Sequence, residues 1–178
     1  MAEEVWHLVE GKREDGVPSI FRIRDLAPRL EQPKIFVVEV FYATPGLARL
    51  PDVAGYRRLA QFEEQWLVPA CNALGWTFVA AKIEDGSAFL YVYGDGDTTP
   101  MIERLSPFDP ALGFFDEADP GWEEYAALHE LLDRAKTFAA APPLEPPPKR
   151  ASNKRAKVTS KLKVAVKKKR ATTRKPRG

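Results

Sequence analysis

The densest set of chemically active side chains in this 178-residue sequence is cationic and lies at its C-terminal end. Residues 149–178 contain 14 Lys and Arg residues, with no acidic and no aromatic residue among them. Such a chain can neutralise backbone phosphates and release condensed counterions, but it offers no ring on which bases could stack. We therefore predict sequence-independent contacts to DNA or RNA. The predicted nucleic-acid-binding residues are Lys149, Arg150, Lys154, Arg155, Lys157, Lys161, Lys163, Lys167, Lys168, Lys169, Arg170, Arg174, Lys175 and Arg177.

Two other interpretations of this basic segment stay open. It could be a solvated tail that aids solubility, or it could fold back on the acidic part of the same chain. If about 6–10 of its charges engage phosphates of duplex DNA, the logarithm of the binding constant should fall with the logarithm of salt concentration with a slope of roughly −5 to −9. The run Lys167–Arg170 also matches a nuclear-localisation pattern, which would matter only in a eukaryote.

A second chemical motif is Asp95-Gly-Asp97-Thr-Thr99, which follows an apolar segment. The Asp-x-Asp-x-Thr spacing resembles the first motif of haloacid-dehalogenase-type phosphatases, where one Asp attacks phosphate beside Mg²⁺. That fold needs several further β-α units, and fewer than fifty residues remain here before a proline-rich segment. We therefore favour an acidic loop in which Thr98 or Thr99 caps a following helix, and keep a metal-dependent phosphatase as a minor alternative.

The remaining acidic cluster could in principle bind a divalent cation, but its spacing is not that of a calcium loop. It comprises Asp116, Glu117, Asp119, Glu123 and Glu124. An Asp119 helix cap and glutamates near a helix N-terminus explain most of these residues without a metal.

No other residue carries a catalytic, metal or cofactor assignment. One cysteine and two histidines cannot build a Cys/His zinc site within one chain. Cys71 is expected to be buried and inert, and His129 to be packed or exposed rather than a catalytic base. Glu39 lies in the middle of an apolar strand, so it either faces a solvated or ligand-binding surface or, as we favour, pairs across strands with Lys82. The sequence thus predicts a protein that is not an enzyme.

Charge divides the chain into two parts. Residues 1–141 carry 13 basic and 24 acidic residues, a balance of −11, whereas residues 142–178 carry 14 basic and one acidic residue, a balance of +13. The apolar share of 44% supports a real core and argues against disorder of the whole chain. No apolar run is long enough for a membrane helix, and the acidic N-terminus does not resemble a secretory or transit peptide, so we expect a cytoplasmic protein.

The elements that would position these residues can be read from spacing. We expect a hairpin over Val5–Arg24, a central strand over Ile35–Tyr42 and, joined by an Asp85-Gly86 turn, two strands over Trp76–Glu84 and Ser87–Tyr93. We expect a helix after Asp52 that Pro69 kinks or ends and Gly75 terminates, a short helix from Pro100, a strand over Leu112–Asp116 and a last helix opened by Asp119-Pro120.

From Ile35 onward this order is strand, helix, strand, strand, helix, strand, the split β-α-β order of ferredoxin-like sheets. We therefore predict an α+β domain over residues 3–138 with a ferredoxin-like antiparallel sheet, an added N-terminal hairpin and a C-terminal helix. A proline-rich linker over 139–148 and a disordered basic tail over 149–178 would follow.

Several landmarks between residues 4 and 135 resemble a bacterial family known only as domain-of-unknown-function 695. They are Trp6, the strand segment Pro33–Tyr42, the helix residues Phe62, Glu63 and Trp66, the strand Tyr91-Val-Tyr93, and Asp119-Pro-Gly-Trp-Glu-Glu-Tyr125, which is the most specific. The same segment of the chain is also similar in pattern to ribonuclease-activity regulator proteins. The first family has no established activity, so the resemblance implies a fold and a bacterial source but no catalytic residues. The basic tail lies outside the family pattern.

These observations predict a non-enzymatic binding or regulatory protein whose tail binds DNA or RNA non-specifically, without a cofactor. The folded domain would contact an unidentified protein or small ligand. The alternative is a regulator of an RNA-degrading enzyme that acts through protein–protein contact.

Overall fold

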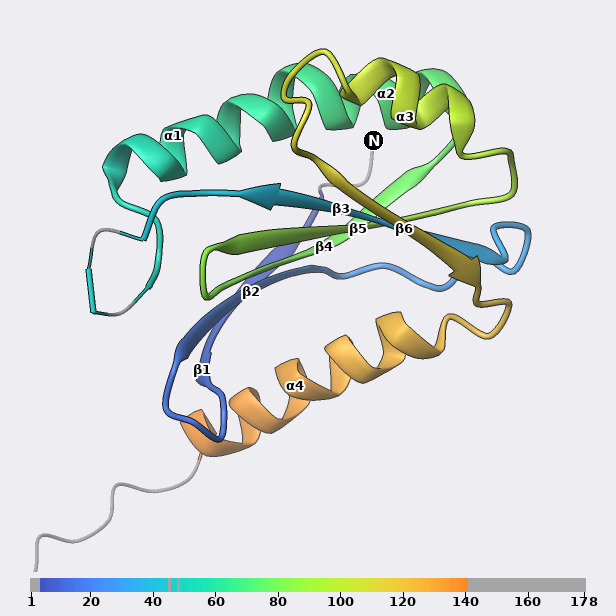
Figure 1. Cartoon of the computed structure of the whole chain (residues 1–178). Helices are drawn as coiled ribbons and strands as arrows, with labels where there is room; N and C mark the ends of the chain where they lie inside the picture. Colours follow the sequence, from blue (N-terminus) through green and yellow to red (C-terminus); the bar gives the residue numbers. More distant parts are fainter. Residues whose placement is uncertain (1–3, 45, 48, 141–178) are drawn as a thin grey trace, which may run out of the picture. The chain divides into compact units, whose positions relative to one another are not determined.

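The computed structural model describes residues 4–44, 46–47 and 49–140 (Figure 1). The basic tail, with all 14 residues predicted to bind nucleic acid, lies outside the described residues. The last helix runs to Ala140, so its final two residues fall within the segment predicted to be a linker.

The described part is an α+β structure built on one six-stranded sheet in which every neighbouring pair is antiparallel. The strands lie in the order β1-β2-β4-β5-β3-β6. Their bounds are β1 Trp6–Lys12, β2 Pro18–Arg24, β3 Lys34–Phe41, β4 Thr77–Glu84, β5 Ser87–Gly94 and β6 Gly113–Ala118. The predicted N-terminal hairpin, formed by β1 and β2, extends the sheet beside β4.

Helices cover both faces of the sheet (Figure 1). One face carries α1 (Val53–Phe62), the π-helix η1 (Glu63–Leu67), α2 (Val68–Leu74) and α3 (Thr99–Leu105), and the other carries α4 (Glu123–Ala140). Strand β3 explains the two layers, because its side chains alternate between faces. Phe36, Val38 and Val40 join the core under the first group of helices, whereas Ile35 joins the core under α4.

The helical segment from Val53 to Leu74 changes its geometry where the sequence predicts a break. Asp52 caps it, accepting a hydrogen bond from the Gly55 N–H at 2.7 Å. Pro69 has no N–H, so the carbonyl of Gln65 lacks its usual helical donor, and the preceding turn is the π-helix η1. Gly75 ends the segment with a φ of 73°, a left-handed conformation that glycine adopts without strain. The described part contains no helix of a length and apolarity suited to crossing a membrane.

Candidate functional site

A cleft of about 300 Å³ opens where the N-terminal hairpin meets η1 and α2. Its floor is buried: Trp76, Thr77 and Phe78 at the start of β4 are each at most 5% exposed. Polar and charged groups converge above this floor from β2, the β2–β3 connection and the helices. The lining residues are Glu4, Trp6, Arg24, Arg29, Glu63, Val68, Cys71, Asn72, Trp76, Thr77 and Phe78.

Two arginines line the cleft, Arg24 at the end of β2 and Arg29 in the connection between β2 and β3. Arg24 donates to the Phe78 carbonyl at 3.3 Å and to a Glu4 carboxylate oxygen at 2.5 Å. Arg29 donates to the Thr77 hydroxyl at 3.3 Å, a neutral acceptor. The β2–β4 pairing brings these arginines to Thr77 and Phe78, which lie about fifty residues away in sequence. Sequence reasoning missed them, because no local pattern marks two arginines around a proline-containing connection.

A third arginine, Arg22, holds a carboxylate that lines the cleft. Arg22 makes two hydrogen bonds of 2.9 Å to the two carboxylate oxygens of Glu63, the first residue of η1. The Arg22 guanidinium also lies 5.0 Å from the centre of the Trp6 ring, in the range of a cation–π contact. This partly buried, bidentate pair fixes the hairpin against the helix and leaves Glu63 neutralised.

Beyond the Arg22–Glu63 pair lies an apolar groove of about 440 Å³ between α1 and the sheet. Leu8, Ile20, Leu59, Ile83 and Leu90 supply most of its wall, and Leu8 is 64% exposed. The cleft and the groove both use Glu63, so the π-helix sits between a polar and an apolar recess. Single π-turns in α-helices are often found at functional sites.

The Asp95–Thr99 motif behaves as a local turn in this structure. Asp97 accepts hydrogen bonds from the Thr99 N–H at 3.1 Å and the Thr99 hydroxyl at 3.0 Å, and these bonds lower its pKa. The predicted capping by Thr98 or Thr99 is wrong in detail, because the accepting side chain belongs to Asp97 and Thr98 makes no side-chain cap. Within the described ranges, no group of three His, Cys, Asp or Glu side chains is placed to hold a metal ion.

Asp119 caps the last helix as predicted. Its carboxylate accepts hydrogen bonds from the Glu123 N–H at 2.8 Å, the Glu124 N–H at 3.1 Å and the Tyr93 hydroxyl at 2.5 Å. Burial would raise the pKa of Asp119, but the hydrogen bonds from Tyr93 and the two N–H groups outweigh burial and lower the pKa below its usual value. In the part of the chain that the structure describes, the other acids of this cluster do not form a group that could hold a metal ion.

Because the pKa of Asp119 is lower in the folded than in the unfolded chain, its carboxylate stabilises the fold above pH ~4 and loses this effect as the pH falls through the folded pKa. We expect Asp119→Asn to lower the free energy of unfolding by about 1–3 kcal/mol at pH 7. The difference from the unsubstituted protein should shrink toward pH 3. Urea titrations at both pH values measure this, with the exposed Asp95→Asn as the control. A difference that does not depend on pH would contradict the assignment.

The two histidines of the chain lie on either side of one carboxylate. His7 Nε2 is 3.6 Å from one Asp25 oxygen, and His129 Nε2 is 3.8 Å from the other. His129 also packs against the Tyr125 ring. Of the two predicted alternatives, a packed or an exposed histidine, the structure shows the packed one. Cys71 is buried as predicted, and burial raises the pKa of its thiol to about 12, which keeps the thiol protonated at neutral pH.

The predicted Glu39–Lys82 pair is wrong. Strand β5 lies between β3 and β4, so Phe89 separates the two side chains in the register. Glu39 instead accepts a hydrogen bond from the Ser87 hydroxyl at 2.6 Å, and Lys82 pairs with Glu84 at 2.6 Å.

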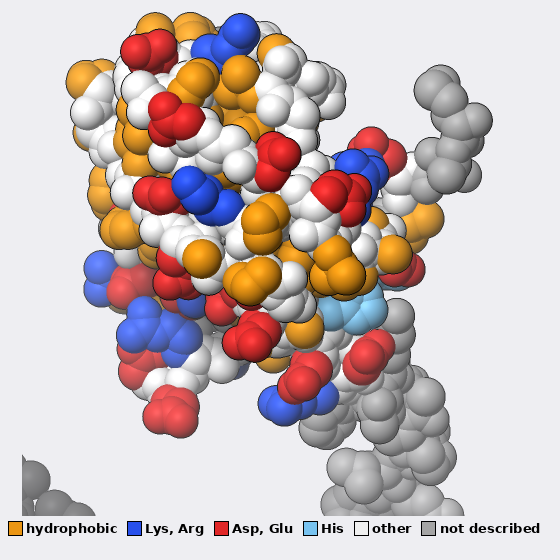
Figure 2. Space-filling view, turned by 90° about the vertical axis from the view of Figure 1, so that its right-hand side faces the viewer, with side chains coloured by type: hydrophobic (Ala, Val, Ile, Leu, Met, Phe, Trp, Pro, Cys, Tyr) orange, Lys and Arg blue, Asp and Glu red, His pale blue; other side chains and the backbone are white. Residues whose placement is uncertain are grey.

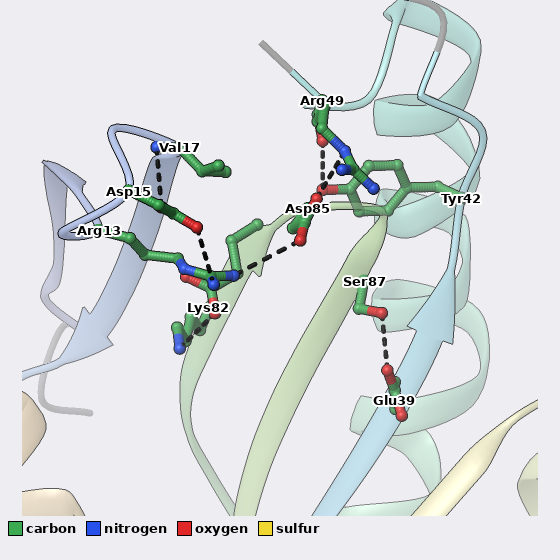
Figure 3. A network of polar contacts seen from close by, with 10 residues as sticks. Arg13, Asp15, Val17, Glu39, Tyr42, Arg49, Lys82, Asp85 and Ser87 are labelled. Carbon is green, nitrogen blue, oxygen red and sulfur yellow. Dashed lines mark hydrogen bonds and ion pairs between the residues drawn. The ribbon is translucent and has the colours of Figure 1, made fainter. Parts of the chain in front are cut away.

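Figure 3 shows Glu39 and Lys82 near a polar network around the β4–β5 turn. In this network, Arg13 and Arg49 reach the Asp85 carboxylate from two different loops, at 3.5 and 2.6 Å. These contacts hold both loops against the β4–β5 hairpin. We therefore interpret the network as structural and not as a binding site.

The surface of the described part reflects its acidic composition. In the view of Figure 2, acidic side chains are spread widely over the face. Comparisons of the chain with protein-family models, with curated proteins and with solved structures find no match. The functional conclusion therefore rests on the residues of this chain.

Proposed function

We propose that this chain is a non-enzymatic binding or regulatory protein that its basic tail holds on DNA or RNA without sequence preference. The separation of charge carries this proposal: residues 1–141 have a balance of −11 and residues 142–178 a balance of +13. Residues 1–141, which we call the acidic body, would be repelled by a phosphate backbone. The affinity for nucleic acid must therefore come from the tail. The body would then supply the specific contact, for which the cleft and the apolar groove are the candidate surfaces.

We also propose that the sheet is ferredoxin-like. Four neighbouring strands, in the order β4-β5-β3-β6, support this assignment. The helical segment from α1 to α2 connects β3 to β4, and α3 connects β5 to β6. We also propose that the chain is related to the domain-of-unknown-function 695 family. Its most specific segment, Asp119–Tyr125, forms the start of α4 and supplies the Asp119 cap and the buried Trp122.

The experiment that tests the function compares tails of different charge on the full chain. One variant carries Gln at all 14 basic positions of residues 149–178, and a matched control carries Lys at the five arginines among them. We expect the control to bind random-sequence duplex DNA and RNA as the unsubstituted protein does, because phosphate neutralisation needs charge and no particular side chain. The Gln variant should show no measurable binding by fluorescence anisotropy at 50 mM salt. Equal binding by the Gln variant would refute the proposal.

A further inference from the structure

We propose that the cleft bounded by Arg24 and Arg29 binds a small organic oxyanion, a carboxylate or a phosphate monoester, and that Glu4 occupies the anion position until the ligand displaces it. This proposal does not depend on the basic tail, and it names a ligand class for the folded part.

The first support is the unequal burial of the Arg24–Glu4 pair. The Arg24 side chain is only 21% exposed and is fixed by the Phe78 carbonyl, whereas the Glu4 side chain is 61% exposed. Glu4 lies before β1, outside the sheet hydrogen bonds that hold Arg24 in β2. A fixed guanidinium with an exposed carboxylate on it is the arrangement that an incoming oxyanion can take over with the same charge-assisted hydrogen bonds.

The second support is the charge of the cleft. Arg24 and Arg29 line the cleft together with the carboxylates of Glu4 and Glu63. Arg22, which lies outside this lining, pairs with Glu63, so the five side chains together carry one positive charge in excess. Glu63 already has its bidentate partner in Arg22, and Arg29 donates to the neutral Thr77 hydroxyl. If Glu4 moves away, the excess rises to two, which suits a carboxylate or a phosphate monoester.

The third support is the shape and the walls of the recess. A volume of about 300 Å³ is at the lower end of the range for small-molecule sites. The indoles of Trp6 and Trp76 and the Phe78 ring line it, with Trp6 and Phe78 centred 5.0 Å apart. Trp76 and Phe78 are nearly buried, so the partly exposed Trp6 ring is the aromatic surface that a planar apolar ligand body attached to the anionic group would contact.

Binding is tested on the full chain with phenyl phosphate and benzoate, and with benzyl alcohol as the uncharged control. Tryptophan fluorescence is the readout, because all four tryptophans lie between residues 6 and 122 and the basic tail has none. Phosphate held by the tail therefore gives no specific signal. We expect a saturable change with at least one anion and none with benzyl alcohol, and the tighter anion identifies the ligand class.

Two substitutions locate the site. Glu4→Gln removes the internal competitor and should tighten binding about threefold or more, whereas Arg29→Gln should weaken it about tenfold or more. Arg134→Gln is the matched control, since Arg134 is 72% exposed on α4, and it should change nothing. Circular dichroism checks that each variant is folded. Absence of a saturable response in both the unsubstituted protein and Glu4→Gln, or unchanged affinity in Arg29→Gln, would overturn the proposal.

Discussion

Replacing Trp122 with Ala should lower the free energy of unfolding by about 3–5 kcal/mol, the loss typical of a large aromatic residue removed from a core. Trp122 is completely buried and stacks on Tyr93, with ring centres 4.0 Å apart and planes 15° apart. Its indole N–H donates to the Gln32 carbonyl at 2.9 Å in a buried position. The substitution would therefore leave a cavity and an unpaired carbonyl under the first turn of α4.

Urea unfolding followed by far-ultraviolet circular dichroism measures this loss without depending on tryptophan emission. Trp66→Ala is the matched control, because Trp66 is only partly buried and meets Phe108 edge-on at 6.0 Å. Its substitution should reduce stability clearly less. A loss for Trp66→Ala that equals or exceeds that of Trp122→Ala would contradict the position of Trp122 at the centre of the α4 core.

The elements that sequence analysis predicted correctly are those that local chemistry decides. The Asp85-Gly86 turn takes positive φ at both residues, 50° and 93°, as a two-residue hairpin turn requires. The Asp52 cap and the Gly75 stop are local in the same sense, because each depends on one residue and its immediate neighbours. The α+β class and the antiparallel sheet followed from the order of such elements.

The features that sequence analysis missed depend on strand register. Glu39 and Lys82 share a face of the sheet, but the insertion of β5 between their strands separates them. The contacts of Arg24 with Phe78 and of Arg29 with Thr77 depend on the β2–β4 pairing. The meeting of His7 and His129 at Asp25 depends on how α4 lies on β1 and β2. No spacing within one segment encodes these contacts, because each joins residues that are distant in the chain.

Salt should weaken the binding of the full chain to DNA by about 10³–10⁵ between 50 and 200 mM, if about 6–10 tail charges contact phosphates. The physical cause is the release of condensed counterions, whose free-energy gain falls as the salt concentration rises. The acidic body adds repulsion from phosphates but contributes no such release. The effect should be the same for unrelated duplex sequences, since the tail has no aromatic side chain with which to stack on bases.

The most direct test of the account is therefore the slope of the logarithm of the binding constant against the logarithm of salt concentration. It should be measured for the full chain on two unrelated duplexes. A common slope of roughly −5 to −9 is the predicted result, since each phosphate contact contributes about −0.9. A slope near zero, or binding to only one of the two sequences, would contradict the claim that the basic tail holds this protein on nucleic acid.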